Sequence, residues 1–188
     1  MKKLAIASLL AAVAMFIWGF VFWATGLSNP FNHLSAEASR AVVDGLKASI
    51  TESGAYQLPD YYVVDQDEFV SRHKEGPIVT IFYRAAGADP QAPAKMLQGF
   101  LHYLVTAVVL AFVLKTVARG LAGYGDRLKL MVVIGVAATI YGNLGNPIWF
   151  HHDWGYHLSV ALYDFVVYVI AGAVLAYFIT GEAEGAEA

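Results

Sequence analysis

The chain contains no cysteine in its 188 residues. Disulfide bonds, thiolate nucleophiles and cysteine-held metals are therefore excluded, so any metal ion would need imidazole, carboxylate or carbonyl ligands. Charged residues are also scarce, at 14%, against about 25% in ordinary soluble proteins. The net charge is −3 and no basic stripe occurs that could neutralise phosphates. These features argue against a nucleic-acid partner.

Familiar catalytic motifs are absent as well. The glycine-rich run 120–125 lacks the Lys-Ser or Lys-Thr pair that completes a phosphate-binding loop. The zinc-protease pattern His-Glu-x-x-His does not occur either. Because no complete catalytic constellation is present, a non-enzymatic role is the favoured expectation.

Charge is missing above all from four long apolar runs, at 4–27, 96–114, 130–150 and 154–181. The first three contain no Asp, Glu, Lys or Arg, and the fourth contains only Asp164. A helix of about 20 apolar residues crosses the ~30 Å hydrocarbon core of a bilayer. The sequence therefore predicts an α-helical integral membrane protein with four transmembrane helices and a small external α+β insertion between the first and second.

The distribution of basic residues predicts the orientation of these helices. Lys2 and Lys3 precede the first run, and a second basic group lies between the second and third runs: Lys115, Arg119, Arg127 and Lys129. Basic residues concentrate on the cytoplasmic side, so both termini are expected to be cytoplasmic and residues 28–95 extracytoplasmic. The compact loops favour a bacterial inner membrane.

The predicted domains follow from this topology. Residues 1–27 form a retained signal-anchor helix, because the apolar run exceeds the ~7–15 residues of a cleaved signal. Its aromatic half is expected to face lipid or another subunit. Residues 28–95 form the extracytoplasmic cap, 96–181 the three-helix transmembrane region, and 182–188 a disordered acidic tail.

Patterns within 28–95 predict short regular elements. Apolar residues recur every four positions from Leu34 to Ile50, which indicates a helix with Ser35 as its N-cap and Gly54 as its stop. The remaining segments predict extended pieces at 55–59 and 61–64, a short helix at 65–74 capped by Asp65, and a strand at 78–83. His33 and His73 are expected to be ordinary surface histidines. So small a domain is marginal alone, and we expect it to lean on the membrane or a partner.

Each of the last three apolar runs carries one face of small and polar residues, which in the third run consists of Gly135, Thr139, Gly142 and Asn146. Such faces pack together in membranes, because small residues allow close approach and polar groups hydrogen bond across the contact. Asp164 needs a partner, since an ionised carboxylate at this depth costs at least ~2–3 kcal/mol. The expected result is a polar pocket in the outer half of the bilayer, lined by His102, Thr106, Thr139, Asn146, His157, Asp164 and Tyr168. Pro147 disfavours helical geometry at Asn146, so we expect the third helix to end there, with a loosened last turn as the alternative.

Histidines near the fourth run form a second candidate site. His151, His152 and His157, with Asp153, offer ligands that suit zinc or copper, although a cluster that binds no metal is the favoured interpretation.

Three hypotheses for function remain. The first is a non-catalytic accessory, assembly or scaffold subunit of a larger membrane complex, whose partners are lipid and other membrane subunits or a second copy. The alternative is a redox or proton-transfer subunit that binds haem, zinc, copper or quinone at the His/Asp pocket, although the presence of such a cofactor is not favoured. The third is an envelope sensor that uses the external cap.

Overall fold

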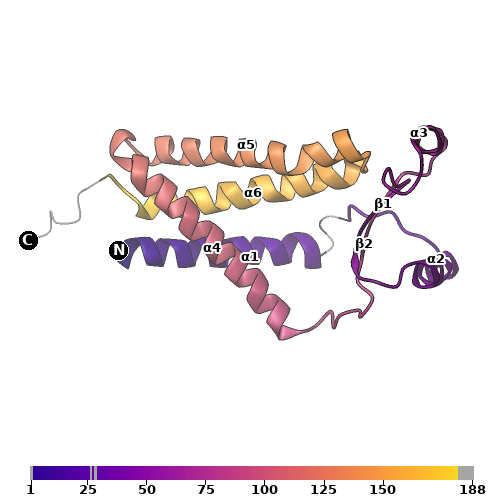
Figure 1. Cartoon of the computed structure of the whole chain (residues 1–188). Helices are drawn as coiled ribbons and strands as arrows, with labels where there is room; N and C mark the ends of the chain where they lie inside the picture. The colour runs from indigo at the N-terminus through magenta and orange to yellow at the C-terminus, as the bar shows by residue number, and fades with distance from the viewer. Residues whose placement is uncertain (1, 26, 28, 182–188) are drawn as a thin grey trace, which may run out of the picture. The chain divides into compact units, whose positions relative to one another are not determined.

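Four long apolar helices dominate the computed structural model, which describes residues 2–25, 27 and 29–181 (Figure 1). Within these residues, α1 (Lys2–Ala24), α4 (Pro93–Val117), α5 (Tyr124–Phe150) and α6 (Trp154–Phe178) are each long and apolar enough to cross a membrane. The prediction of four long apolar helices is therefore confirmed. The predicted acidic tail, 182–188, lies outside the described residues.

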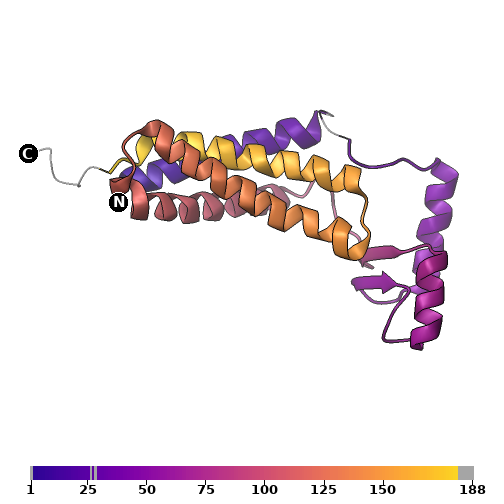
Figure 2. The ribbon, with the colours of Figure 1, turned by 90° about the horizontal axis from the view of Figure 1, so that it is seen from above.

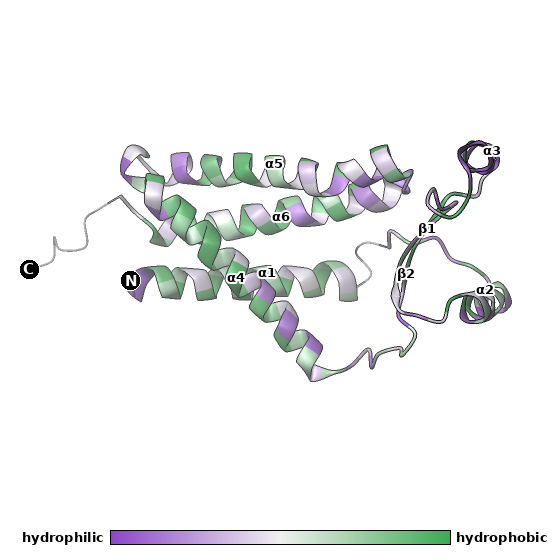
Figure 3. Cartoon of the chain, viewed as in Figure 1, coloured by the Kyte–Doolittle hydropathy of each residue, from purple (hydrophilic) through white to green (hydrophobic). Residues whose placement is uncertain are grey.

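The described chain divides into two compact units. The helical unit contains α1, α4, α6 and α5 as far as Gly145, and the second unit contains residues 31–90 and 146–153. In the helical unit, α5 and α6 run side by side in both views of the ribbon (Figure 1, Figure 2). Apolar residues are spread along all four long helices (Figure 3).

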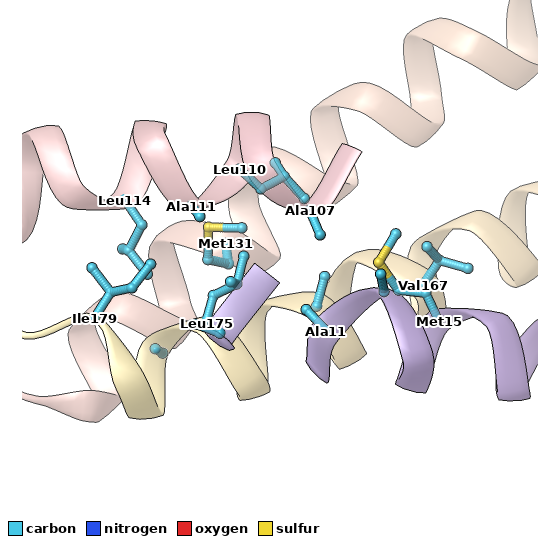
Figure 4. Close-up of a cluster of buried hydrophobic side chains, with 14 of the residues drawn as sticks. Ala11, Met15, Ala107, Leu110, Ala111, Leu114, Met131, Val167, Leu175 and Ile179 are labelled. Atoms are coloured by element: carbon cyan, nitrogen blue, oxygen red, sulfur yellow. The ribbon is translucent and has the colours of Figure 1, made fainter. Parts of the chain in front are cut away.

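The core of the helical unit forms where α1 packs against α4 and α6 (Figure 4). Ala7, Ala11 and Ala12 of α1 are fully buried, and Met15 is 1% exposed. Small side chains let neighbouring helices approach closely, which replaces the hydrophobic driving force that is missing between helices in lipid. The alanine-rich half of α1 therefore makes it the centre of the packing.

The aromatic half of α1 packs inward more than the sequence predicts. Trp18 and Phe22 contact the ring of Tyr163 on α6, with centroids 6.5 and 5.0 Å away, and Phe22 is 3% exposed. Phe20 remains on the outside, at 65% exposed. The expectation that this half faces lipid or another subunit is thus wrong for Trp18 and Phe22, because the α6 ring offers them an aromatic surface.

The contact between α5 and α6 follows a strict four-residue period. A ridge of buried residues on α5 faces α6, made of Arg127, Met131, Gly135, Thr139 and Asn143. A Cβ atom placed on Gly135 would lie 2.5 Å from Tyr168 Cβ, and one on Gly172 would lie 2.6 Å from Met131 Cβ. The two helices therefore touch through glycines that no larger residue can replace without separating them.

The basic segment between α4 and α5 is partly helical in the structure. Helix α4 is followed by a 3₁₀ turn, η1 (Ala118–Gly120), and α5 begins at Tyr124, before the start of the third apolar run. Arg127, in the first turns of α5, is buried and its Nε donates to the carbonyl oxygen of Ala176 at 3.0 Å. This contact satisfies one of the carbonyls left without a helical partner at the end of α6.

The prediction that the third long helix ends at Asn146, and the alternative of a loosened last turn there, are both wrong. Helix α5 continues through Pro147 to Phe150. Proline removes only one N–H donor from the helix, and in an apolar environment the other backbone groups are best satisfied by continuing the helix.

Helices α2 (Ala36–Ser49) and α3 (Gln66–Glu75) of the second unit begin at the predicted caps. Ser35 Oγ accepts from the Ala38 N–H at 3.1 Å, and Asp65 Oδ1 accepts from the Glu68 N–H at 2.9 Å. These side chains satisfy amide groups that have no partner within the helix. The prediction of both helices is confirmed, although α2 ends at Ser49, with Ile50 as its C-cap, rather than at Gly54.

A two-stranded antiparallel sheet completes the described part of this unit. Strand β1 (Gly54–Leu58) pairs with β2 (Val79–Tyr83), in the register that places Tyr56 opposite Ile81. The predicted extended piece at 61–64 is wrong, because these residues form a turn. Asp60 holds this turn, since its carboxylate accepts from the Tyr62 N–H at 2.8 Å.

Candidate intramembrane polar site

The carboxylate of Asp164 on α6 meets an amide side chain of α5. Asn143 is 7% exposed, and its Nδ2 donates to Asp164 Oδ2 at 2.8 Å and to the carbonyl oxygen of Thr139 at 3.3 Å. Both contacts use the amide group as donor, which suits an acceptor carboxylate. Asn143 is therefore a neutral hydrogen-bond partner for the half-buried Asp164, and α6 itself contains no Lys or Arg that could pair with the carboxylate.

Two further polar groups border this pair. Thr139, one turn before Asn143, is 8% exposed, and its Oγ1 has no hydrogen-bond partner among the residues that the structure describes. Tyr168 lies one turn after Asp164 and packs over Gly135. Together, Thr139, Asn143, Asp164 and Tyr168 form the polar layer of the α5–α6 contact.

The structure places the other predicted pocket residues elsewhere. His102 lies on an exposed face of α4, and Thr106 Oγ1 donates to the carbonyl oxygen of His102 at 3.0 Å within the same helix. His157 is buried at the start of α6, where its ring contacts Tyr156 at 5.1 Å. Asn146 belongs to the second unit. The structure thus brings Thr139, Asp164 and Tyr168 together, and adds Asn143.

Asn143 is the functional candidate that the sequence reasoning did not select. The predicted stripe continues from Thr139 to Gly142 and Asn146, at spacings of three and four. Gly142 is exposed instead, and the buried ridge advances by four residues at every step. A strict four-residue period from Gly135 through Thr139 predicts Asn143 as the next residue of the face, so the sequence contained the pattern that identifies it.

The three histidines of the predicted metal site are divided between the units. His157 belongs to the helical unit, whereas His151 and His152 belong to the second unit. His152 Nε2 lies 3.0 Å from Thr80 Oγ1, and Thr80 Oγ1 donates its proton to Gln57 Oε1. His152 is therefore the donor to Thr80. Across residues 2–25, 27 and 29–181, no group of three or more His, Asp and Glu side chains could hold a metal ion.

A second polar contact joins three helices of the helical unit. The hydroxyls of Tyr103 on α4 and Tyr163 on α6 hydrogen bond to each other, and Trp18 Nε1 on α1 donates to the Tyr163 carbonyl oxygen at 3.3 Å. Gly19 leaves room for the two hydroxyls, because a Cβ atom there would lie 2.8 Å from the Tyr103 hydroxyl oxygen. This glycine therefore sets the distance between α1 and the tyrosine pair.

Replacing Gly19 with alanine is expected to weaken the α1 contact by forcing the tyrosine pair apart. The loss should be about 1 kcal/mol, near that of one hydrogen bond. The double variant Gly19→Ala/Tyr103→Phe removes the clashing oxygen. We therefore expect its loss of stability to be smaller than the sum of the losses of the two single variants. Detergent-unfolding midpoints of the four variants in the cycle measure this coupling, and simple additivity would contradict the explanation.

No family model, curated protein or solved structure matches this chain, so the interpretation of its function rests on the geometry described above. The fold defines a class, a helical protein with four candidate membrane spans and a small α+β unit.

Proposed function

We propose that the protein is a non-catalytic multi-pass membrane protein that serves as an accessory, assembly or scaffold subunit of a larger membrane complex. The observation that supports this function is the uncovered apolar surface of the second unit. No residue of α2 is buried against the described chain, although the helix has an apolar face. On that face Val42 is 51% exposed, and Leu34, just before the helix, is 63% exposed.

Other large apolar side chains of the second unit have still larger exposed fractions. Tyr62 is 94% exposed, Val63 78% and Phe82 80%. A two-stranded sheet and two short helices bury little surface of their own, and such elements need a further surface for stability. Extensive exposed apolar surface marks interaction sites on soluble parts of proteins. A partner subunit would cover it.

We place the second unit outside a bacterial inner membrane, with both termini in the cytoplasm. Two contacts within the unit support this placement: the His73 and His151 rings lie 5.2 Å apart, and His152 bonds to Thr80. Residues 66–83 and 151–153 must then share one side of the membrane. Four spans place the basic segment 115–129 on the opposite side, which is the cytoplasmic one by its charge.

A single charge on the apolar face tests the proposed docking. Val42→Asp should release the partner that co-purifies with the wild type from native membranes, because an ionised group cannot enter an apolar contact without a partner. Lys47→Asp, which changes the charge of the same helix outside the apolar stripe, is the matched control and should retain the partner. Equal retention by both variants, or a wild-type protein that purifies as an isolated monomer, would contradict the proposed function.

Proton transfer through Asp164 is the alternative function that one observation favours. Ionisable side chains within membrane helices mark proton and ion pathways by default, and Asp164 combines partial exposure with a neutral Asn143 partner. Proteoliposomes that contain a pH-sensitive dye provide the test. Asp164→Asn should abolish a proton flux carried by the wild type, whereas equal fluxes for the two proteins would eliminate this alternative.

A further inference from the structure

Two histidines far apart in the sequence lie side by side in the second unit. His73 is in the last turn of α3, and His151 follows the end of α5. Their ring centroids are 5.2 Å apart with an interplanar angle of 69°. His73 is half-buried and His151 is exposed, so the pair is open to small solutes.

The spacing of the two rings is compatible with two imidazoles bound to one metal ion. Two imidazoles that share a zinc ion, with Zn–N bonds of about 2.0–2.1 Å and a near-tetrahedral angle, have ring centroids roughly 5 Å apart. We propose that His73 and His151 are the two protein ligands of a site for a divalent transition-metal ion of the zinc and copper class. Imidazole nitrogens are preferred ligands of these ions.

Neighbouring groups restrain the His73 ring and the backbone at His151. Phe69, one turn earlier on α3, contacts the His73 ring at 5.4 Å. His151 has a φ of 56°, in the left-handed region, and the next residue is fixed by the bond from His152 to Thr80. A ring that is already oriented loses less freedom when it binds an ion. The loop and the helix therefore present a preorganised pair of ligands.

The site differs from a structural zinc site in its number of ligands. Because the described residues hold no group of three or more suitable side chains, water would fill the remaining coordination positions. Binding to two elements distant in sequence also ties α3 to residues 151–153. An ion that binds the folded state alone stabilises it by RT ln(1 + c/Kd), where c is the free ion concentration, so the stabilisation rises with the logarithm of that concentration once the site is nearly saturated.

Copper titration of the full-length protein tests this inference. The protein is purified with an affinity tag that contains no histidine, stripped with a chelator, and titrated with Cu²⁺ under electron paramagnetic resonance. We expect one equivalent of ion bound by two imidazole nitrogens. His73→Phe keeps an aromatic ring against His151 but removes the ligand, and should weaken binding by about tenfold or more.

A second variant separates loss of the ligand from loss of the fold. His151→Asn removes the imidazole while it retains a residue that tolerates left-handed backbone. It should also lose the tight copper signal, whereas His33→Phe should bind as the wild type does. The inference would be overturned if the wild type bound Cu²⁺ no more tightly than His73→Phe, or if His33→Phe reduced binding equally. The titration uses the purified protein without any partner, so its outcome does not depend on the docking proposal.

Discussion

Replacing Gly135 with alanine is expected to destabilise the packing of α5 on α6 by about 1–3 kcal/mol, the usual cost of overpacking a well-packed interface. The added methyl group would lie 2.5 Å from Tyr168 Cβ. A Cβ atom is fixed to the backbone, so Tyr168 cannot avoid the clash by changing its rotamer. The two helices must separate, and the neighbouring bond between Asn143 and Asp164, 2.8 Å long, should lengthen with them.

Gly142→Ala is the matched control on the same helix. Gly142 has open space around it, with nothing within 4 Å of an added Cβ in the described chain. Alanine also favours a helix over glycine by up to about 1 kcal/mol, so this variant should be neutral or slightly stabilised. Unfolding by sodium dodecyl sulfate in mixed micelles, followed by circular dichroism, compares the two. Equal midpoints would show that α5 and α6 do not meet through Gly135.

Asp164→Leu is expected to reduce stability by about 1–2 kcal/mol, because it removes an interhelical hydrogen bond and leaves a buried amide donor without its acceptor. Asn143, at 7% exposed, cannot turn its Nδ2 group to water. Asp164→Asn keeps an acceptor oxygen for that donor, so it should be the milder change. The same detergent unfolding measures both variants.

A double variant tests whether the effect of Asp164→Leu arises from its pairing with Asn143. Replacing both partners by apolar residues leaves no unsatisfied group, so Asn143→Leu/Asp164→Leu should recover most of the stability that Asp164→Leu loses. Strict additivity of the two single changes would mean that the side chains are not coupled. Equal tolerance of Asp164→Leu and Asp164→Asn would show that the carboxylate makes no contribution to the contact between α5 and α6.

The elements of this fold were predictable where a local signal determines them. Apolar runs longer than 18 residues with at most one charged residue can only be buried or in lipid, so the four long helices follow from composition. Ser35 and Asp65 mark the starts of α2 and α3 because a cap acts on amides three residues away. At 61–64 two local signals conflict, because the aromatic and β-branched residues favour a strand whereas the Asp60 side chain accepts from the Tyr62 N–H and stabilises a turn.

The candidate sites were less predictable, because they depend on contacts between distant residues. The sequence identifies Asp164 as a carboxylate that needs a partner. Which residue is that partner depends on the rotation of α5 about its axis. The predicted stripe turns Gly142 and Asn146 toward the contact, whereas in the structure Asn143 is the buried residue. His73 has no local feature that distinguishes it from a surface histidine. Its contact with His151 joins segments that only the folded chain brings together.

The membrane topology is the central claim, and single-cysteine labelling tests it most directly. The chain has no cysteine of its own, so each variant carries one reactive site. Ser71 and Ala122 are both exposed and lie on either side of α4 along the chain. An impermeant maleimide should label Ser71→Cys in intact cells and Ala122→Cys only after the membrane is opened. Labelling of both positions from the same side would contradict the four-span arrangement, and with it the intramembrane placement of Asp164.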